Sequence, residues 1–246
     1  MSMCQHLPSS PGRQPELAGV VFDLDGVLVS TEHLHYAAWK QMAEEEHLPF
    51  GPHLSGKLRG VSRPVSLRII FDSAGLPPPD DALSARLCER KNELYLQLIR
   101  NLGPSDLFPG VRELLLELRR RKVLCAVASA SRNCLIVLER TGLLPLLDAV
   151  IDGNSFARSK PDPQCFQLAL ERLRLDPNRC VGVEDAAVGI EAIHRAGMAA
   201  LGIGPDAEGA DVRVGSLAEV SPEMLHDVLR RFGPVYAKTP QAGVPQ

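Results

Sequence analysis

The chain has 246 residues, of which 45% are hydrophobic and 23% are charged, and its formal net charge is −3. This size and balance fit one globular domain, or a core with a modest insert, and the charge gives no electrostatic basis for binding nucleic acid. No apolar run approaches the roughly 20 residues of a membrane-spanning helix. The N-terminus lacks the basic region followed by an apolar stretch that is typical of a signal peptide.

The first elements are a disordered extension, one strand and a helical insert. Residues 1–17 are rich in Pro, Ser and Gly and are expected to be disordered. A buried strand is predicted over 17–22. From residue 32 to residue 106 no buried strand is indicated, and helices are predicted over 33–47, 62–73 and 81–100. An all-helical insert at this point would form a cap domain over the carboxyl edge of the sheet, where ligands bind in open α/β sheets.

From residue 107 onwards, apolar runs alternate with helical patterns. The runs lack polar alternation, which is typical of parallel strands covered on both faces. We therefore expect an α/β fold with a doubly wound parallel sheet, whose core comprises residues 18–31 and 107–235, followed by a flexible tail over 236–246. The predicted strands are 123–128, 149–151, 180–183 and 198–203, and the predicted helices are 111–121, 134–140, 163–173 and 187–196.

The six cysteines are scattered and include no CxxC pair. Cys125 and Cys180 lie in or beside apolar runs, which is typical of small buried side chains in a reducing compartment rather than of a disulfide or zinc framework. We expect a cytoplasmic protein.

Polar side chains follow four of the predicted strands. Asp23 and Asp25 come directly after the first strand and, being two residues apart, point the same way. Two carboxylates this close repel each other unless a cation or a shared proton relieves them. The same sequence also fits a solvated Asp-Gly turn. It matches the start of a calcium-binding loop too, but the further ligand and the closing Glu of such a loop are absent.

The other three positions are weaker taken singly. Ser129 follows the second strand and could cradle an oxyanion or cap a helix. Lys160 begins a turn that Pro161 and Pro163 stiffen and could equally be a surface lysine, and Glu184 and Asp185 could cap the next helix. Because all four positions lie at the carboxyl ends of strands in one sheet, they converge on one edge. Carboxylates for a hard divalent cation, a hydroxyl and a fixed ammonium suit phosphoryl transfer.

Together these residues resemble the four motifs of the haloacid dehalogenase superfamily. The resemblance implies that Asp23 is the nucleophile and Asp25 the general acid/base, while Lys160 and Ser129 balance the charge of the transferring group. It also implies a Mg²⁺ ion, held by Asp23, by Asp185, by the backbone carbonyl of Asp25 and, directly or through water, by Glu184.

The helical insert narrows the resemblance to the beta-phosphoglucomutase-like subfamily. His35 and Trp39 lie on one helix face and could be core packing, but with the loop 59–63 they resemble the subfamily's substrate site. Arg63 would clamp the phosphate that is not transferred, and Lys91 would contact sugar hydroxyls. Arg59 stands where these mutases usually have Lys, and Ser30 replaces a common Asp. The expected substrate-binding residues are Thr31, His35, Trp39, Arg59, Gly60, Val61, Ser62, Arg63, Lys91, Ala130, Ser131, Arg132 and Asn133.

The resemblance implies a monomeric, Mg²⁺-dependent enzyme that interconverts beta-D-glucose 1-phosphate and glucose 6-phosphate through an aspartyl phosphate and beta-glucose 1,6-bisphosphate. One alternative is a sugar-phosphate phosphatase of the same subfamily, in which water accepts the phosphoryl group. A catalytically idle relative that serves as a binding module is disfavoured, because Asp23, Asp25, Lys160 and Asp185 are all present.

Overall fold

The computed structural model describes residues 16–236 of the chain. The predicted extension 1–17 and tail 236–246 lie outside these residues, except for Glu16, Leu17 and Tyr236. At these edges the expectation of disorder is wrong, since Leu17 is buried in the hydrophobic core and Tyr236 ends the last helix.

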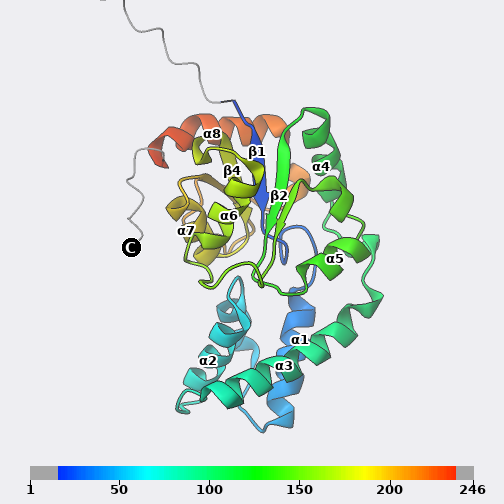
Figure 1. Cartoon of the computed structure of the whole chain (residues 1–246), viewed down its shortest axis with the longest axis vertical. Coiled ribbons are helices and arrows are strands. Elements are labelled where there is room, and N and C mark those ends of the chain that lie inside the picture. The colour runs from blue at the N-terminus through cyan, green and yellow to red at the C-terminus, as the bar shows by residue number, and fades with distance from the viewer. Residues whose placement is uncertain (1–15, 237–246) are drawn as a thin grey trace, which may run out of the picture.

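The core is a six-stranded sheet in which every pairing is parallel, in the order β3-β2-β1-β4-β5-β6. This confirms the predicted α/β fold class, with the helices lying around the sheet in Figure 1. The strands are β1 (Gly19–Phe22), β2 (Leu124–Ala128), β3 (Ala149–Ile151), β4 (Cys180–Glu184), β5 (Ala199–Ile203) and β6 (Val212–Val214).

Helices cover both faces of the sheet, as a doubly wound fold requires. On one side α6 (Gln164–Leu173) packs on β2 and β3, and α7 (Ala187–Arg195) packs on β4 and β5. On the other side lie α4 (Val111–Arg120), α5 (Cys134–Arg140) and α8 (Pro222–Tyr236). Side chains alternate between the two cores along each strand. Phe22, for example, joins the cluster with α4 and α8, and Val21 joins the cluster with α6 and α7.

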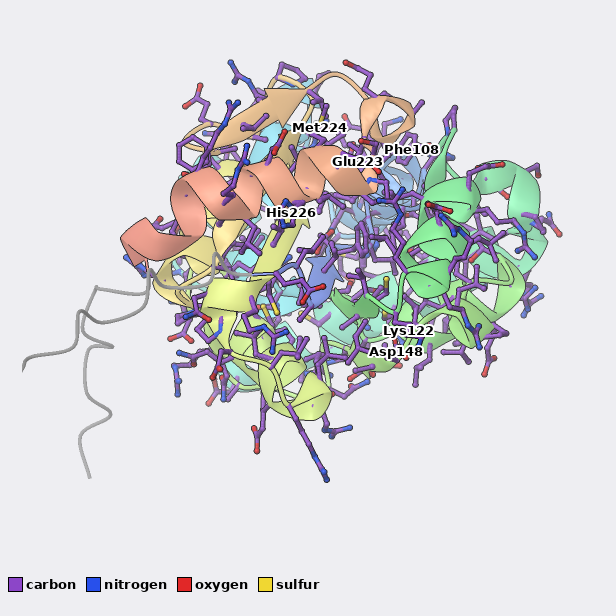
Figure 2. All side chains as sticks on the ribbon, turned by 90° about the horizontal axis from the view of Figure 1, so that it is seen from above. Phe108, Lys122, Asp148, Glu223, Met224 and His226 are labelled. Atoms are coloured by element: carbon purple, nitrogen blue, oxygen red, sulfur yellow. The ribbon has the colours of Figure 1, made fainter. Side chains whose placement is uncertain are left out.

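One strand and one α-helix of the described chain were not predicted. β6 extends the sheet beyond β5, and α8 packs against β4 and β5; Figure 2 shows α8 running across the sheet from the end that carries Glu223 and Met224. The strand at 198–203 is therefore not the last one. The other predicted strands and helices are confirmed, with ends that differ by one or two residues.

The segment after β1 is helical, as predicted. It contains α1 (Glu32–Glu45), α2 (Arg63–Ser73) and α3 (Asp81–Leu98), and α1 and α3 pack along each other. Asp80 begins α3 because its carboxylate accepts a hydrogen bond from the Leu83 N–H, 2.8 Å away. In Figure 1 the three helices lie together beyond the carboxyl ends of the strands. This arrangement places helical side chains opposite the edge where the polar motifs converge.

The remaining whole-chain expectations concern membranes and cysteines. Among residues 16–236, no helix has both the length and the apolar character needed to cross a bilayer. Cys125 and Cys180 are buried free thiols, as expected, and burial raises the pKa of each to about 12.

Candidate active site

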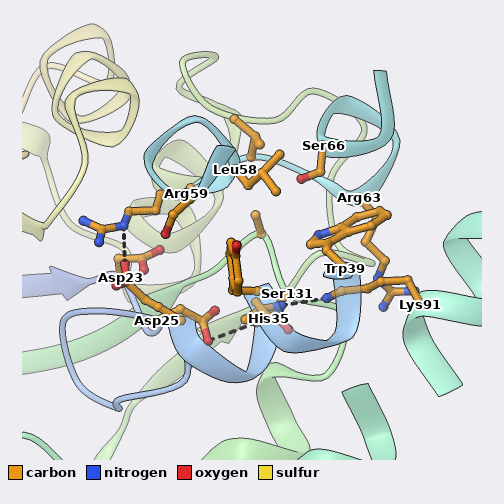
Figure 3. A pocket seen from close by; sticks show the side chains of 16 residues that line it. Asp23, Asp25, His35, Trp39, Leu58, Arg59, Arg63, Ser66, Lys91 and Ser131 are labelled. Atoms are coloured by element: carbon orange, nitrogen blue, oxygen red, sulfur yellow. Dashed lines mark hydrogen bonds and ion pairs between the residues drawn. The ribbon is translucent and has the colours of Figure 1, made fainter. Parts of the chain in front are cut away.

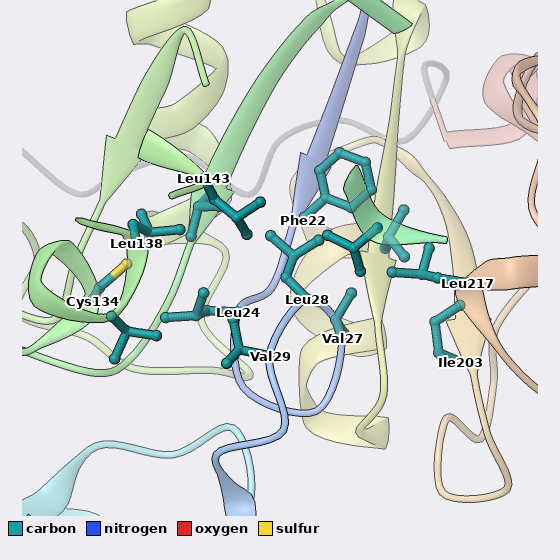
Figure 4. Close-up of a cluster of buried hydrophobic side chains, with 14 of the residues drawn as sticks. Phe22, Leu24, Val27, Leu28, Val29, Cys134, Leu138, Leu143, Ile203 and Leu217 are labelled. Atoms are coloured by element: carbon teal, nitrogen blue, oxygen red, sulfur yellow. The ribbon is translucent and has the colours of Figure 1, made fainter. Parts of the chain in front are cut away.

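The site begins with the loop that leaves β1. Leu24, between the two aspartates, is fully buried and packs with Leu28 and Val29 in the core shown in Figure 4. Because neighbouring side chains in an extended segment point to opposite sides, burial of Leu24 turns Asp23 and Asp25 away from this core. Gly26 closes the turn at φ +86°, a conformation that L side chains rarely adopt.

The parallel register then brings the motifs together. β1 lies between β2 and β4, with Phe22 opposite Val127 on one side and Val183 on the other. The N–H of Asp23 donates to the Val183 carbonyl at 2.9 Å. Asp23 is consequently beside the ends of β2 and β4, which lead into Ser129 and Asp185.

Lys160 joins two of these acids. Its ammonium donates to Asp23 Oδ1 at 2.5 Å and to Glu184 Oε1 at 2.8 Å, and it lies 5.0 Å from the ring centre of Phe166. Burial opposes the charge of Lys160, but the carboxylates of Asp23 and Glu184 outweigh it and raise the lysine pKa. The other Glu184 oxygen accepts from the N–H groups of Asp185 and Ala186. The ammonium and this carboxylate are therefore fixed in place.

Asp23, Glu184 and Asp185 offer carboxylate oxygens that all lie within 4.8 Å of one another. Burial is the main cause that raises the pKa of Asp23 to about 8 and that of Asp185 to about 11, and neighbouring negative charge adds to it. One ammonium thus leaves three buried acids under-compensated. A hard divalent cation such as Mg²⁺ fits this set, because it prefers oxygen ligands and supplies the missing positive charge.

Asp25 faces away from this cluster. The Thr31 hydroxyl donates to Asp25 Oδ1, His35 Nε2 lies 3.3 Å from the same oxygen, and the Ser129 hydroxyl lies 3.5 Å from Oδ2. Burial alone would raise the pKa of Asp25, but His35, with Thr31 and Lys91, outweighs it and holds the pKa below its ordinary value. Asp25 is therefore an ionised carboxylate, as a base must be. Its part in metal binding, expected through the backbone carbonyl, stays a prediction.

The helical segment supplies a second buried ammonium. Lys91 Nζ lies 2.8 Å from His35 Nδ1, 4.6 Å from the ring centre of Tyr95 and 5.3 Å from that of Trp39. The Tyr95 ring also stacks on His35, with centroids 4.0 Å apart. Burial, then the charge of Lys91, lowers the pKa of His35, and the charge of Asp25 opposes this shift. Lys91 donating to Nδ1 places the imidazole proton on Nε2, facing Asp25.

One pocket of about 780 Å³, part of which is open to solvent, is lined by Asp23, Asp25, His35, Trp39 and Lys91 among others. Figure 3 shows Asp23 and Asp25 toward one end and Arg63 and Lys91 toward the other. Of the residues predicted to bind substrate, those lining the pocket are His35, Trp39, Arg59, Gly60, Val61, Arg63, Lys91, Ala130 and Ser131.

Arginines gather at the far end of the pocket. Burial, then the nearby charge of Arg132, lowers the pKa of Arg63. Neither guanidinium has an ion pair with a carboxylate within residues 16–236. Arg63, which lines the pocket without an ion-paired carboxylate and with Arg132 nearby, favours binding of an anion at this end.

The other predicted contacts join the helical segment to the sheet domain. Ser62 and Ser159 share a hydrogen bond of 3.3 Å, and the Asn133 amide donates to Asn92 Oδ1 at 2.9 Å. Arg59 pairs with Glu32 and with Asp206. Direct substrate binding by Ser62, Asn133 and Arg59 stays a prediction.

The sequence reasoning missed several residues of the site. Ser66 and Tyr95 are buried and lie one helical turn after Arg63 and Lys91, so their spacing on the helix face was an available signal. Asp206 follows the strand 199–203, the pattern that identified the other acids. Glu32 lies next to Thr31, but acidic residues are common in the first turn of a helix, so nothing in the sequence marked Glu32 as part of the site.

Comparison with known proteins agrees with this geometry. The family model for haloacid dehalogenase-like hydrolases matches residues 17–197. Beta-phosphoglucomutase of Bacillus subtilis is 37% identical over 219 residues, which cover 88% of this chain and 97% of that protein. A phosphorylated carbohydrates phosphatase of Thermotoga maritima is 30% identical, with 87% and 99% covered. The crystal structure of beta-phosphoglucomutase from Clostridium difficile superposes with a TM-score of 0.84 at 29% identity, covering 88% of this chain and 98% of that chain.

Proposed function

The chain belongs to the haloacid dehalogenase-like hydrolase family, and we propose that within it this protein is a Mg²⁺-dependent hexose phosphate mutase. It interconverts beta-D-glucose 1-phosphate and glucose 6-phosphate through an aspartyl phosphate and beta-glucose 1,6-bisphosphate. The observation that carries the proposal is a pocket lined at one end by Asp23, whose carboxylate is paired with Lys160, and at the other end by Arg63, on which the charge of Arg132 acts (Figure 3). Lys160 and Arg63 thus favour an anion position at each end. A sugar that carries phosphates at both ends needs both positions.

Asp23 is the proposed nucleophile. Its carboxylate attacks phosphorus, the bond from phosphorus to the sugar oxygen breaks, and Asp23 becomes an aspartyl phosphate. Lys160, hydrogen-bonded to Asp23 at 2.5 Å, opposes the rise in the pKa of Asp23 that burial causes, and it offsets the charge of the incoming phosphate. A Mg²⁺ ion held by Asp23, Asp185 and Glu184 would add Lewis-acid stabilisation of the transferring group.

Asp25 is the proposed general base. It takes the proton from the sugar hydroxyl that attacks the aspartyl phosphate, and it returns a proton to the leaving hydroxyl in the reverse half-reaction. Thr31 and His35 come from the start of the helical segment and hold the Asp25 carboxylate. The base is thus aligned when that segment lies against the sheet.

We propose that residues 32–106 act as a cap domain. Its side chains Arg63 and Lys91 would hold the phosphate that is not transferred and the sugar hydroxyls. The bisphosphate then turns and presents its other phosphate to Asp23, which returns the enzyme to its starting state. Contacts between the segment and the sheet domain favour exclusion of water, which an aspartyl phosphate needs if it is to react with a sugar.

A sugar-phosphate phosphatase is the second candidate. It is supported by the similarity to the Thermotoga phosphatase and by Arg59, which is paired to two carboxylates instead of facing the pocket freely. In this case water takes the phosphoryl group from Asp23, with Asp25 as its base.

A coupled assay tests the mutase proposal. The purified protein is given beta-glucose 1-phosphate, Mg²⁺ and a trace of beta-glucose 1,6-bisphosphate, and glucose 6-phosphate is followed with its dehydrogenase. We expect steady formation of glucose 6-phosphate, a loss of at least ~10³-fold in Asp23→Asn and of ~10²-fold or more in Asp25→Asn. Absence of glucose 6-phosphate from the wild-type reaction would contradict the proposal.

A further inference from the structure

A buried carboxylate oxygen of the helical segment has no use in the function proposed above. Glu32 is the first residue of α1, and its Oε1 atom is buried with no aligned hydrogen-bond partner among the described residues. Buried polar atoms are nearly always hydrogen-bonded, and an acceptor left without a donor destabilises the fold. Arg59 Nε lies 2.9 Å from this oxygen but is not aligned for a hydrogen bond, so the oxygen can still accept one from water.

The oxygen borders the acidic cluster. A Cβ atom placed on Gly26 would lie 2.2 Å from Asp185 Oδ2 and 2.9 Å from Glu32 Oε1. The two carboxylates thus approach the same small space, which stays open because residue 26 has no side chain. Glu32 is nevertheless outside the set of three carboxylates that lie within 4.8 Å of one another. It stands at the edge of that set.

Arg59 holds Glu32 in this position. Its Nε atom lies 2.9 Å from Glu32 Oε1, and its Nη1 atom lies 2.5 Å from Asp206 Oδ2. One guanidinium can meet two carboxylates in this way because its donors are fixed in a plane. With two acids on one arginine, the group keeps a net negative charge beside Asp185, which favours a cation there.

We propose that Glu32, oriented by Arg59, is an outer carboxylate of the metal site that accepts a hydrogen bond from water on the bound cation. The inference rests on the proposed Mg²⁺ dependence. It adds that the helical segment contributes to the metal site, so that cation affinity depends on the position of this segment.

The test is a calorimetric Mg²⁺ titration of the full-length protein, compared with Glu32→Ala. Loss of an outer partner weakens metal binding by about 10–100-fold, and we expect a rise in Kd of about tenfold here, because Glu32 is partly exposed. Glu32→Gln keeps an acceptor oxygen and loses the charge, so its Kd should fall between the two. Glu44→Ala is the matched control, since Glu44 is exposed on the same helix and forms an ion pair with Lys40; its Kd should equal that of wild type.

Each outcome separates the two proposals. A wild-type protein that binds no Mg²⁺ contradicts the proposed function itself. A wild type that binds Mg²⁺, with folded Glu32→Ala and Glu32→Gln variants whose Kd stays within twofold of it, overturns only the role of Glu32. If the circular dichroism of Glu32→Ala shows that it is unfolded, Glu32→Gln alone decides, and an unchanged Kd again overturns the proposal.

Discussion

At the scale of single residues, Lys91 is the most constrained cation of the helical segment. Its exposed fraction is 1%, and its neighbours are His35 and two aromatic rings. Burial, then the charge of Arg63, lowers the pKa of Lys91 to about 7. The folded protein therefore holds this proton less tightly than the unfolded chain, where the lysine pKa is near 10.5.

This difference predicts the pH dependence of stability. Below pH 7 Lys91 is charged in the folded protein, and its burial lowers the free energy of unfolding by the full amount. As the pH rises from 7 toward 10.5, the folded protein loses this charge and its free energy of unfolding rises. Lys91→Met has no such titrating group, so its free energy of unfolding does not rise in this way. Relative to wild type it should therefore fall by roughly 2–3 kcal/mol between pH 7 and pH 9.5. Urea unfolding of both proteins at several pH values measures it. Parallel profiles would show that Lys91 is not a buried, shifted lysine.

At the scale of elements, the contact between β4 and α7 fixes Glu184. Gly189 lies inside α7, where glycine weakens a helix by about 1 kcal/mol relative to alanine. A Cβ atom on Gly189 would lie 1.8 Å from Glu184 Oε1. The helix therefore needs glycine at this position, because a side chain would displace the carboxylate that holds Lys160.

Gly189→Ala should show this requirement. We expect a loss of about 1–3 kcal/mol in the free energy of unfolding from overpacking, together with a fall in phosphoryl transfer of at least about tenfold, because Glu184 and Lys160 lose their positions. Gly56→Ala is the control, since a Cβ there meets no atom within 4 Å. Urea unfolding and steady-state assays measure both effects, and wild-type behaviour of Gly189→Ala would contradict the packing described here.

The elements were largely predictable from sequence because each leaves a local pattern. The apolar run 180–183 and the periodic leucines of 111–121 identify a buried strand and a helix by themselves. α8 has such a pattern too, with Leu225, Val228 and Leu229 buried at helical spacing, and it could have been predicted. β6 could not, because three residues between polar neighbours carry no usable periodicity.

The residues of the site also fall into a group that the sequence predicts and a group that it does not. Asp23, Ser129, Lys160 and Asp185 follow strand ends, and the parallel register brings such positions together regardless of detail. The pairing of Arg59 with Asp206, or of Asn92 with Asn133, joins polar residues far apart in the chain. Nothing in their local sequence specifies these partners, so only the structure shows them.

At the scale of the whole molecule, polar contacts add to the shared apolar cluster in joining the helical segment to the sheet domain. Besides Arg59 with Asp206 and Ser62 with Ser159, the Arg140 guanidinium donates to the Arg100 carbonyl. Each such hydrogen bond contributes about 1 kcal/mol. Contacts of this size can break and re-form, as the proposed cap domain would require during each catalytic cycle.

Weakening one contact should therefore change where the phosphoryl group goes. Asn92→Ala removes the acceptor of the Asn133 amide, and we expect the ratio of hydrolysis to isomerisation to rise about fivefold, the effect of about 1 kcal/mol on closure. Gln97→Ala, an exposed change on the same helix, should leave the ratio unaltered. Product analysis by phosphorus NMR gives both rates, and an unchanged ratio in Asn92→Ala would show that this contact does not control access of water.

The partition of the phosphorylated enzyme tests the central claim most directly. Protein labelled on Asp23 with radioactive phosphate is mixed with excess beta-glucose 1-phosphate and Mg²⁺, and label is followed into sugar bisphosphate and into inorganic phosphate within a single turnover. The two anion positions of the pocket predict that most of the label reaches the sugar. Release of most of the label as inorganic phosphate, at a rate that the sugar does not change, would show that water is the natural acceptor and that the enzyme is a phosphatase.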